Sequence, residues 1–316
     1  MTESIIMQLS PGMSPAPAGP RGVGMPLALR VGYDMRFDVG GPLPTAMVFM
    51  LYAHPAVAGQ LEGPERIVVE PEGSAVETFL DSFGNRCARL IATPGVPLRV
   101  AYDNVFQTTY DAEAQPDSAT PQEAAGALPV EVLPFLLGSR YCEVDRLSAI
   151  AWDLFGKLPA GGTRALAINR WVFENVRFGY RFTRPNKTAL DTYVERSGVC
   201  RDMTHLAIAF CRAMNIPARY ATGYLADIDA EPDPTPMDFS AFYEVYLGGR
   251  WWPMDARHGR ARIGRVLMAR GRDATDVALV TSFGPHKLTK FTVLTEPVGT
   301  MTLPMPVPAE ALARSA

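Results

Sequence analysis

The sequence has no feature that marks a metal-binding or disulfide-stabilised protein. Its four cysteines lack the closely spaced pairs that are typical of zinc sites and small disulfide scaffolds. They are Cys87, Cys142, Cys200 and Cys211. Histidine is equally scarce, with four residues in 316. We therefore expect free thiols, and no ligand spacing indicates a bound metal or a cofactor.

The chain also lacks a strong charge of one sign and a long apolar run. Its formal net charge is -3 and its isoelectric point is about 5.9, which argues against nucleic acid or an anionic membrane as a partner. The longest apolar run, Leu43–Ala53, is well short of the ~20 residues of a membrane-spanning helix. The N-terminus resembles no secretory signal. We expect no membrane span and a location in the cytoplasm.

Alternating apolar and polar residues predict an all-β N-terminal domain over residues 27–109, after a Pro- and Gly-rich tail at 1–26. The clearest strand is Leu29–Val39, where every second residue is apolar. The other strand-like segments are Ala46–Ala53, Glu65–Glu70, Val76–Phe83, Arg86–Ala92 and Leu98–Phe106. Gly84-Asn85 predicts a hairpin. Six strands at short spacing indicate a sandwich-like or barrel-like unit.

The hydrophobic period changes after a linker at residues 110–129. Apolar residues recur at helical spacing in Cys142–Gly156, Thr163–Phe178 and Cys200–Met214, with Asp145 and Thr163 as candidate N-caps. Extended segments follow at Ala218–Ala226 and in a hairpin across Gly248-Gly249. Helices followed by antiparallel strands predict an α+β core domain at residues 130–297 and a C-terminal tail at 298–316.

Cys200 stands at the start of a predicted helix, directly after Ser197-Gly198-Val199. The thiolate is the reactive form of cysteine, and a helix N-terminus stabilises negative charge through its free N–H groups. We therefore predict that Cys200 is a nucleophile whose pKa lies below the usual ~8.5. Cys211, deep in the same helix, is expected to be a buried small apolar residue.

Three segments resemble the transglutaminase-like superfamily of papain-type cysteine enzymes, in its bacterial form. They are Gly198–Leu225, Ala241–Gly259 and Gly271–Ala278. The resemblance extends over about Leu27–Val293. It implies helices packed on an antiparallel sheet, preceded by a β-sandwich accessory domain, and a Cys-His-Asp triad in which the carboxylate orients the imidazole.

The implied activity is acyl transfer or hydrolysis on a peptide, amide or thioester substrate, through an acyl-enzyme on Cys200. Cysteine peptidases, amidases and acyltransferases all resemble this sequence, so hydrolysis and transfer both stay open. Residue by residue, Asp255 falls on the orienting acid. The family motif His-Ala-aromatic-x-Glu-Val-Tyr corresponds to Ser240–Tyr246, which puts Ser240 where the histidine should be. The alternative is a catalytically inactive binding module that lost its triad histidine.

Two of the four histidines lie near the matched motifs. His258 follows Asp255 by three residues, so a turn there could direct its ring toward Cys200. His205 lies about 140° around an ideal helix from Cys200, which favours a packing role. Ser240 is no base at neutral pH, but it can donate a hydrogen bond or leave room for another side chain.

Two further groups of residues border the matched hairpin. The aromatic residues Tyr243, Trp251 and Trp252 are expected to pack the sheet, and they are also candidates for the wall of a substrate cleft. The arginines form a basic segment that could bind a carboxylate, although a solvated face is the preferred interpretation. They are Arg262, Arg265, Arg270 and Arg272.

Overall fold

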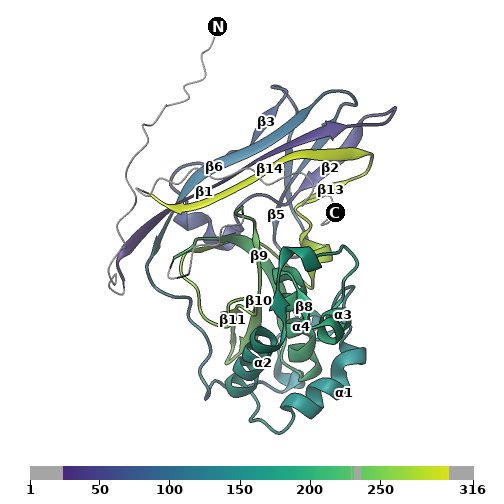
Figure 1. Cartoon of the computed structure of the whole chain (residues 1–316). Coiled ribbons are helices and arrows are strands. Elements are labelled where there is room, and N and C mark those ends of the chain that lie inside the picture. Colours follow the sequence, from purple (N-terminus) through teal and green to yellow (C-terminus); the bar gives the residue numbers. More distant parts are fainter. Residues whose placement is uncertain (1–23, 229, 231–235, 299–316) are drawn as a thin grey trace.

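A computed structural model describes residues 24–228, 230 and 236–298. The chain forms a β-rich part, purple to blue with a yellow strand, stacked on a part in which helices cover a second sheet (Figure 1). All four cysteines are free thiols, as expected, and Cys211 is fully buried. Within the described residues, no helix is long and apolar enough to cross a membrane.

The β-rich part contains two four-stranded sheets. Its strands are β1 (Pro26–Val39), β2 (Thr45–Phe49), β3 (Val68–Glu70), β4 (Glu77–Leu80), β5 (Arg86–Ala92), β6 (Leu98–Thr109), β13 (Val280–Ser282) and β14 (His286–Pro297). The sheet orders are β14-β1-β6-β3 and β13-β2-β5-β4. The six predicted strands all form, and β4 and β5 pair as the predicted hairpin. Inward-facing residues of β1, such as Val31 and Met35, are fully buried between the sheets.

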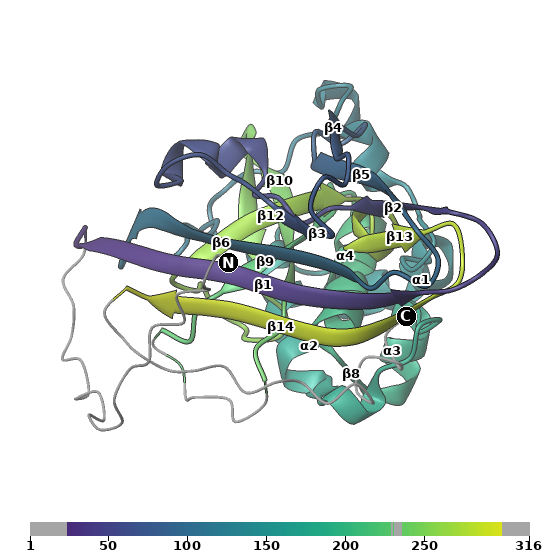
Figure 2. The ribbon, with the colours of Figure 1, turned by 90° about the horizontal axis from the view of Figure 1, so that it is seen from above.

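The last two strands return to the N-terminal sheets. β14 pairs with β1 along almost its whole length, and Tyr33 lies opposite Val293. β1, β6 and β14 lie side by side across the molecule when it is seen from above (Figure 2). The sequence placed residues 280–297 with the core, because a local pattern can indicate a strand but cannot identify its distant partner.

The core consists of one sheet and four helices. The sheet has the order β11-β10-β9-β12. Its strands are β9 (Ala218–Leu225), β10 (Ser240–Leu247), β11 (Arg250–Met254) and β12 (Arg265–Gly271), and the helices are α1 (Val144–Phe155), α2 (Gly162–Asn175), α3 (Ala189–Glu195) and α4 (Cys200–Ala213). β7 (Arg177–Phe178) and β8 (Ser197–Gly198) form a short parallel pair. The 3-10 turns are η1 (Pro55–Gln60), η2 (Ala125–Ala127), η3 (Leu133–Leu136), η4 (Tyr180–Phe182) and η5 (Ala274–Val277).

The three predicted helices correspond to α1, α2 and α4, but both predicted N-caps are wrong. The caps of α1 and α2 are Glu143 and Gly161, so Asp145 and Thr163 lie inside the first helical turn. An acidic residue in the first turn stabilises a helix through its dipole without capping it. α3 was not predicted because it is only seven residues long. Its N-cap is Thr188, whose side chain accepts the Asp191 N–H.

Helix α4 lies at the centre of the core (Figure 1). It packs against α1, α2 and α3 and against β9 and β10, and every residue from Asp202 to Ala213 is buried. The other face of the sheet packs on the β-rich part, where Tyr224 and Val266 share an apolar cluster with Val31. The sheet is therefore held between α4 and the β sandwich, which fixes the start of α4 relative to β10.

Most of the arginines near β12 do not form a solvated face. Arg262 is buried and donates to the Ala226 carbonyl. Arg265 binds Asp255 and Glu113 at 2.7 and 2.8 Å. Arg270 binds Glu244, and the half-exposed Arg272 binds Asp276. The expectation of a solvated face is wrong for Arg262, Arg265 and Arg270, whose partners lie on other segments that sequence spacing does not reveal. It holds for Arg272, which is exposed and binds a residue four positions away.

We expect Arg212→Met to destabilise the core. Arg212 is 2% exposed and donates to the carbonyls of Leu137, Ala218 and Arg272. Methionine fills a similar volume but leaves these acceptors without a donor, which costs about 3 kcal/mol. Urea unfolding measures the difference. The matched control is Arg170→Met, which breaks an exposed pair on α2 and leaves stability unchanged; equal losses in both variants would contradict the role of Arg212.

Candidate active site

Cys200 is the first residue of α4. The turn that precedes it, Ser197-Gly198-Val199, packs tightly on the helix. The Asp202 carboxylate accepts the Val199 N–H at 3.1 Å, so the helix start is capped from its own first turn. Gly198 leaves no room for a side chain, because a Cβ there would lie 2.8 Å from the Asp202 Cβ. Cys200 itself is half-buried, at the helix N-terminus predicted from the sequence.

The sulfur of Cys200 lies next to the start of β10. The Ala241 backbone forms a hydrogen bond with it, and the charges of Arg257 and Asp238 act on it. Burial raises the pKa of the Cys200 thiol above its usual value, and Arg257 and the Ala241 hydrogen bond offset this only in part. The predicted acidic thiol is therefore wrong. A protonated thiol needs a base at the moment of attack.

Asp255 and His258 form a hydrogen-bonded pair. Asp255 Oδ1 accepts the His258 backbone N–H at 2.9 Å, and Gly259, with φ at +66°, closes the turn through its own N–H to the Asp255 carbonyl. His258 Nδ1 lies 2.9 Å from Asp255 Oδ2, which Arg265 also binds at 2.7 Å. The predicted turn after Asp255 therefore exists, and it directs the imidazole at the carboxylate.

The pair has well-defined protonation states. Burial alone would raise the pKa of Asp255, but the His258 hydrogen bond and the Arg265 charge hold that pKa far below its usual range. Burial lowers the pKa of His258, although Asp255 opposes this. At neutral pH the carboxyl is ionised and the imidazole is neutral. Nδ1 then donates to Asp255, which leaves Nε2 as a proton acceptor.

A small cavity of about 50 Å³ lies beside this pair. Its lining includes Tyr180, Asp238, Ser240, Arg257 and His258. Ser240 is 4% exposed, and among the described residues its hydroxyl has no hydrogen-bond partner. Ser240 also directly precedes the residue whose backbone bonds the Cys200 sulfur. The cavity thus brings Ser240 and His258 together, and Asp255 adjoins it through its bond to His258. Cys200 is not among the described lining residues and adjoins the cavity through Ala241, the neighbour of Ser240.

His205 is part of the core packing. It is fully buried, and its Nε2 accepts the Ala274 N–H at 3.1 Å. Its ring stacks on Tyr141 and packs against Tyr220, with centroids 5.0 and 5.1 Å away. Burial lowers the pKa of His205 to about 3. The packing role favoured from the sequence is confirmed, and the role of proton acceptor considered for it does not fit this environment.

The three aromatic residues considered for a substrate cleft pack elsewhere. Tyr243 is fully buried and donates to Asn169 at 3.0 Å. Trp252 donates to the Leu247 carbonyl at 2.9 Å, and Trp251 packs on other aromatic rings of a separate cluster. None of them is among the described residues that line the cavity. These contacts agree with the preferred expectation that the three aromatic residues pack the sheet.

The sequence did not single out the charged residues Asp227, Asp238 and Arg257, which also line the cavity. Arg257 lines it, with its guanidinium 3.9 Å from the ring centre of Phe178. Asp238 ends an acidic, Pro-rich segment that resembles an exposed loop. The sequence could have indicated Arg257 alone, because it lies between Asp255 and His258. A residue inside that turn is necessarily close to the site.

Comparisons with known proteins agree with this fold. Residues 149–256 match the sequence model of the Transglutaminase-like superfamily. A crystal structure from Cytophaga hutchinsonii, described as a candidate cysteine protease, is 32% identical with a TM-score of 0.75, and the match covers 90% of this chain and 95% of that one. An uncharacterised protein from Mycobacterium leprae is 33% identical over 116 residues, which are 36% of this chain and 41% of that protein.

The match to the mycobacterial protein thus spans less than half of that relative's length. The match to the Cytophaga structure extends over both the β-rich part and the core. Together with the family match, it confirms the resemblance seen in the motifs and the α+β core that the resemblance implied. This chain belongs to the transglutaminase-like superfamily.

Proposed function

We propose that this protein catalyses cysteine-dependent acyl transfer or hydrolysis on a peptide, amide or thioester substrate. Cys200 is the nucleophile, His258 is the general base and Asp255 orients the imidazole. Membership of the superfamily supports cysteine chemistry of this general type. The Cytophaga protein, described as a candidate cysteine protease, supports a peptide substrate. The cytoplasmic location stays a prediction from the sequence.

The hydrogen bond between His258 and Asp255 carries this proposal. In the family motif the histidine would stand at position 240, at the start of β10. Here the small side chain of Ser240 faces the same cavity as His258. The imidazole is therefore supplied from the turn after β11 instead of from the first residue of β10, while the carboxylate keeps its place. This arrangement is a triad with a transposed histidine.

The reaction begins when the Cys200 sulfur attacks the carbonyl carbon and His258 Nε2 takes the thiol proton. The backbone N–H of Cys200 is the first candidate to stabilise the oxyanion. Collapse of the tetrahedral intermediate breaks the bond to the leaving group, which receives the proton from His258. A thioester then remains on Cys200. Water or an amine attacks it, His258 takes the proton of that nucleophile, and the Cys200 sulfur leaves with a proton returned by His258.

We expect Cys200→Ala to abolish acylation by p-nitrophenyl acetate and His258→Ala to slow it by roughly 10²- to 10⁴-fold, the usual contribution of a general base. Release of p-nitrophenolate gives the rate, and peptide mass mapping locates the acetyl group. His286→Ala is the matched control, because His286 is exposed on β14. Acylation of the Cys200→Ala protein at the wild-type rate would refute the nucleophile, and a folded wild-type protein that is never acylated would favour the binding-module alternative.

The pH dependence of acylation should show the base directly. The pKa of His258 lies below its ordinary 6.5, and only the neutral imidazole accepts a proton. The rate should therefore rise with pH through a midpoint below 6.5 and then level off. In His258→Ala this step should be absent, and the residual rate should follow the thiolate, whose pKa burial raises. A wild-type profile without the acid step would contradict His258 as the base.

Restoring a histidine at position 240 tests the transposition. We expect Ser240→His alone to be impaired, since a second imidazole does not fit beside His258 in a cavity of about 50 Å³. The double variant Ser240→His/His258→Ala should acylate at least about 10-fold faster than His258→Ala, because one imidazole is again available to the thiol. A double variant no faster than His258→Ala would show that the two positions are not equivalent.

A further inference from the structure

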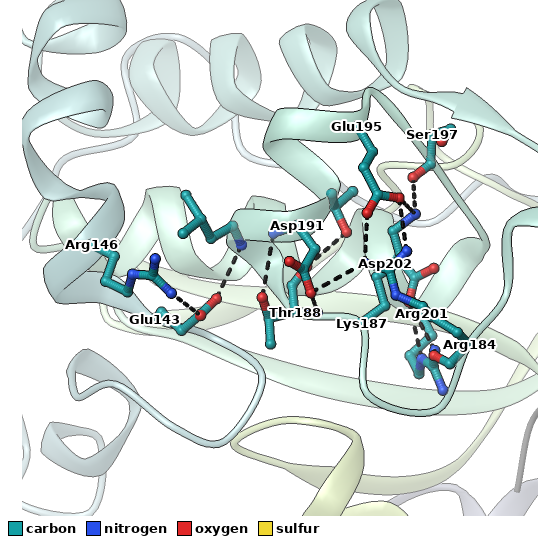
Figure 3. Close-up of polar contacts among 12 residues, drawn as sticks. Glu143, Arg146, Arg184, Lys187, Thr188, Asp191, Glu195, Ser197, Arg201 and Asp202 are labelled. Carbon is teal, nitrogen blue, oxygen red and sulfur yellow. Dashed lines mark hydrogen bonds and ion pairs between the residues drawn. The ribbon is translucent and has the colours of Figure 1, made fainter.

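A buried lysine lies behind the turn that leads into Cys200. The side chain of Lys187 is fully buried, and its Nζ donates to the Ser197 carbonyl at 2.6 Å (Figure 3). The same Nζ lies 2.9 Å from a Glu195 carboxylate oxygen. Lysine is among the residues least often fully buried, and a buried ammonium requires a paired charge and hydrogen-bond acceptors. Both are present here.

Glu195 is held in its ionised form at the end of α3. Its carboxylate also accepts from Arg184 at 3.0 Å. The hydrogen bond from Arg184, with a smaller contribution from Lys187, lowers the pKa of Glu195 to about 2. The Glu195 carboxylate is therefore ionised throughout the neutral range, and the Lys187 Nζ contacts both this carboxylate and the Ser197 carbonyl.

The turn is fixed from its other side as well. Asp202 accepts the Val199 N–H, and Arg201 binds Asp202 and donates to the Arg184 carbonyl at 2.6 Å. The Gly198 carbonyl accepts the Gly179 N–H at 3.0 Å. Donors and acceptors thus hold each of the three residues before Cys200. Two of these contacts come from fully buried ionisable side chains, those of Lys187 and Asp202.

We propose that Lys187 is a positioning residue for Cys200, an inference that rests on the proposed function. By holding the Ser197 carbonyl, Lys187 fixes where α4 begins and hence where the Cys200 sulfur lies relative to Ala241 and His258. Without the ammonium, the Ser197 carbonyl and the Glu195 carboxylate lose a buried partner, and the turn relaxes to find others. A displacement of about 1 Å at a reacting atom costs up to about 100-fold in rate.

The test compares Lys187→Met, which keeps most of the apolar stem, with the wild-type protein. The first measurement is the acylation rate with p-nitrophenyl acetate as a function of ester concentration. The second is the pH profile of alkylation by iodoacetamide, which reports Cys200 in the folded protein because Cys87, Cys142 and Cys211 are buried. Near-ultraviolet circular dichroism at the assay temperature verifies folding.

We expect folded Lys187→Met to acylate at least about 10-fold more slowly at saturating ester, with the half-saturating concentration within about two-fold of wild type. The alkylation midpoint should shift, because the sulfur leaves its place at the helix N-terminus. Arg146→Met is the matched control: it breaks the Arg146–Glu143 pair of Figure 3, far from the turn, and should leave both measurements unchanged. Wild-type values in folded Lys187→Met would overturn the inference.

A second variant covers the case in which Lys187→Met does not fold. Glu195→Gln keeps the size of the side chain but removes the charge partner of Lys187, so both measurements should change in the same direction by a smaller amount; wild-type values there would overturn the inference too. A different result would contradict the proposed function. If the Cys200→Ala protein is still acylated, the nucleophile is wrong, whereas the alkylation profile of Lys187→Met still reports whether Lys187 positions this thiol.

Discussion

The candidate site depends on one buried carboxylate. Asp255 is 1% exposed, and an ionised group at that depth must be paired to persist. Arg265 balances its charge, and His258 donates through both its backbone and its ring. The imidazole cannot reorient without depriving this buried carboxylate of one of its three donors. The hydrogen bonds to Asp255 therefore fix the tautomer of His258 and the direction of its Nε2.

The raised pKa of Cys200 decides how such a site would work. A preformed pair of thiolate and imidazolium needs an acidic thiol, and burial of the sulfur opposes that form. A neutral imidazole beside a protonated thiol instead moves the proton only during attack, as a hydroxyl nucleophile requires. The first turn of α4 then contributes mainly by holding the sulfur and by offering N–H groups to the oxyanion, which develops later.

Much of the fold could be predicted from the sequence, because its signals are local. The alternation in β1, the helical period of α4 and the glycines between β10 and β11 each describe a short segment. The turn that pairs Asp255 with His258 is also a local signal, since the two residues are only three positions apart. The position of Cys200 at a helix start was equally visible.

What the sequence did not reveal depends on distant partners. The pairing of β14 with β1 joins residues about 250 positions apart. Arg265 meets Asp255 although β12 and β11 lie at opposite edges of their sheet. The acidity of Cys200 was predicted from the helix dipole alone, whereas its burial is set by packing around the site. Tyr243 and Trp251 could not be assigned to a cleft or a core without knowing which face of the sheet each one occupies.

The central claim is that His258 shares a proton with Cys200, and nitrogen NMR of the His258 imidazole tests it most directly. The spectrum is recorded before and after Cys200 is alkylated with iodoacetamide, with His258→Ala to assign the signals. We expect the Nε2 resonance and the pKa of His258 to change on alkylation, while Nδ1 stays protonated and bonded to Asp255. An Nε2 resonance and a pKa that are both indifferent to the state of Cys200 would contradict the claim.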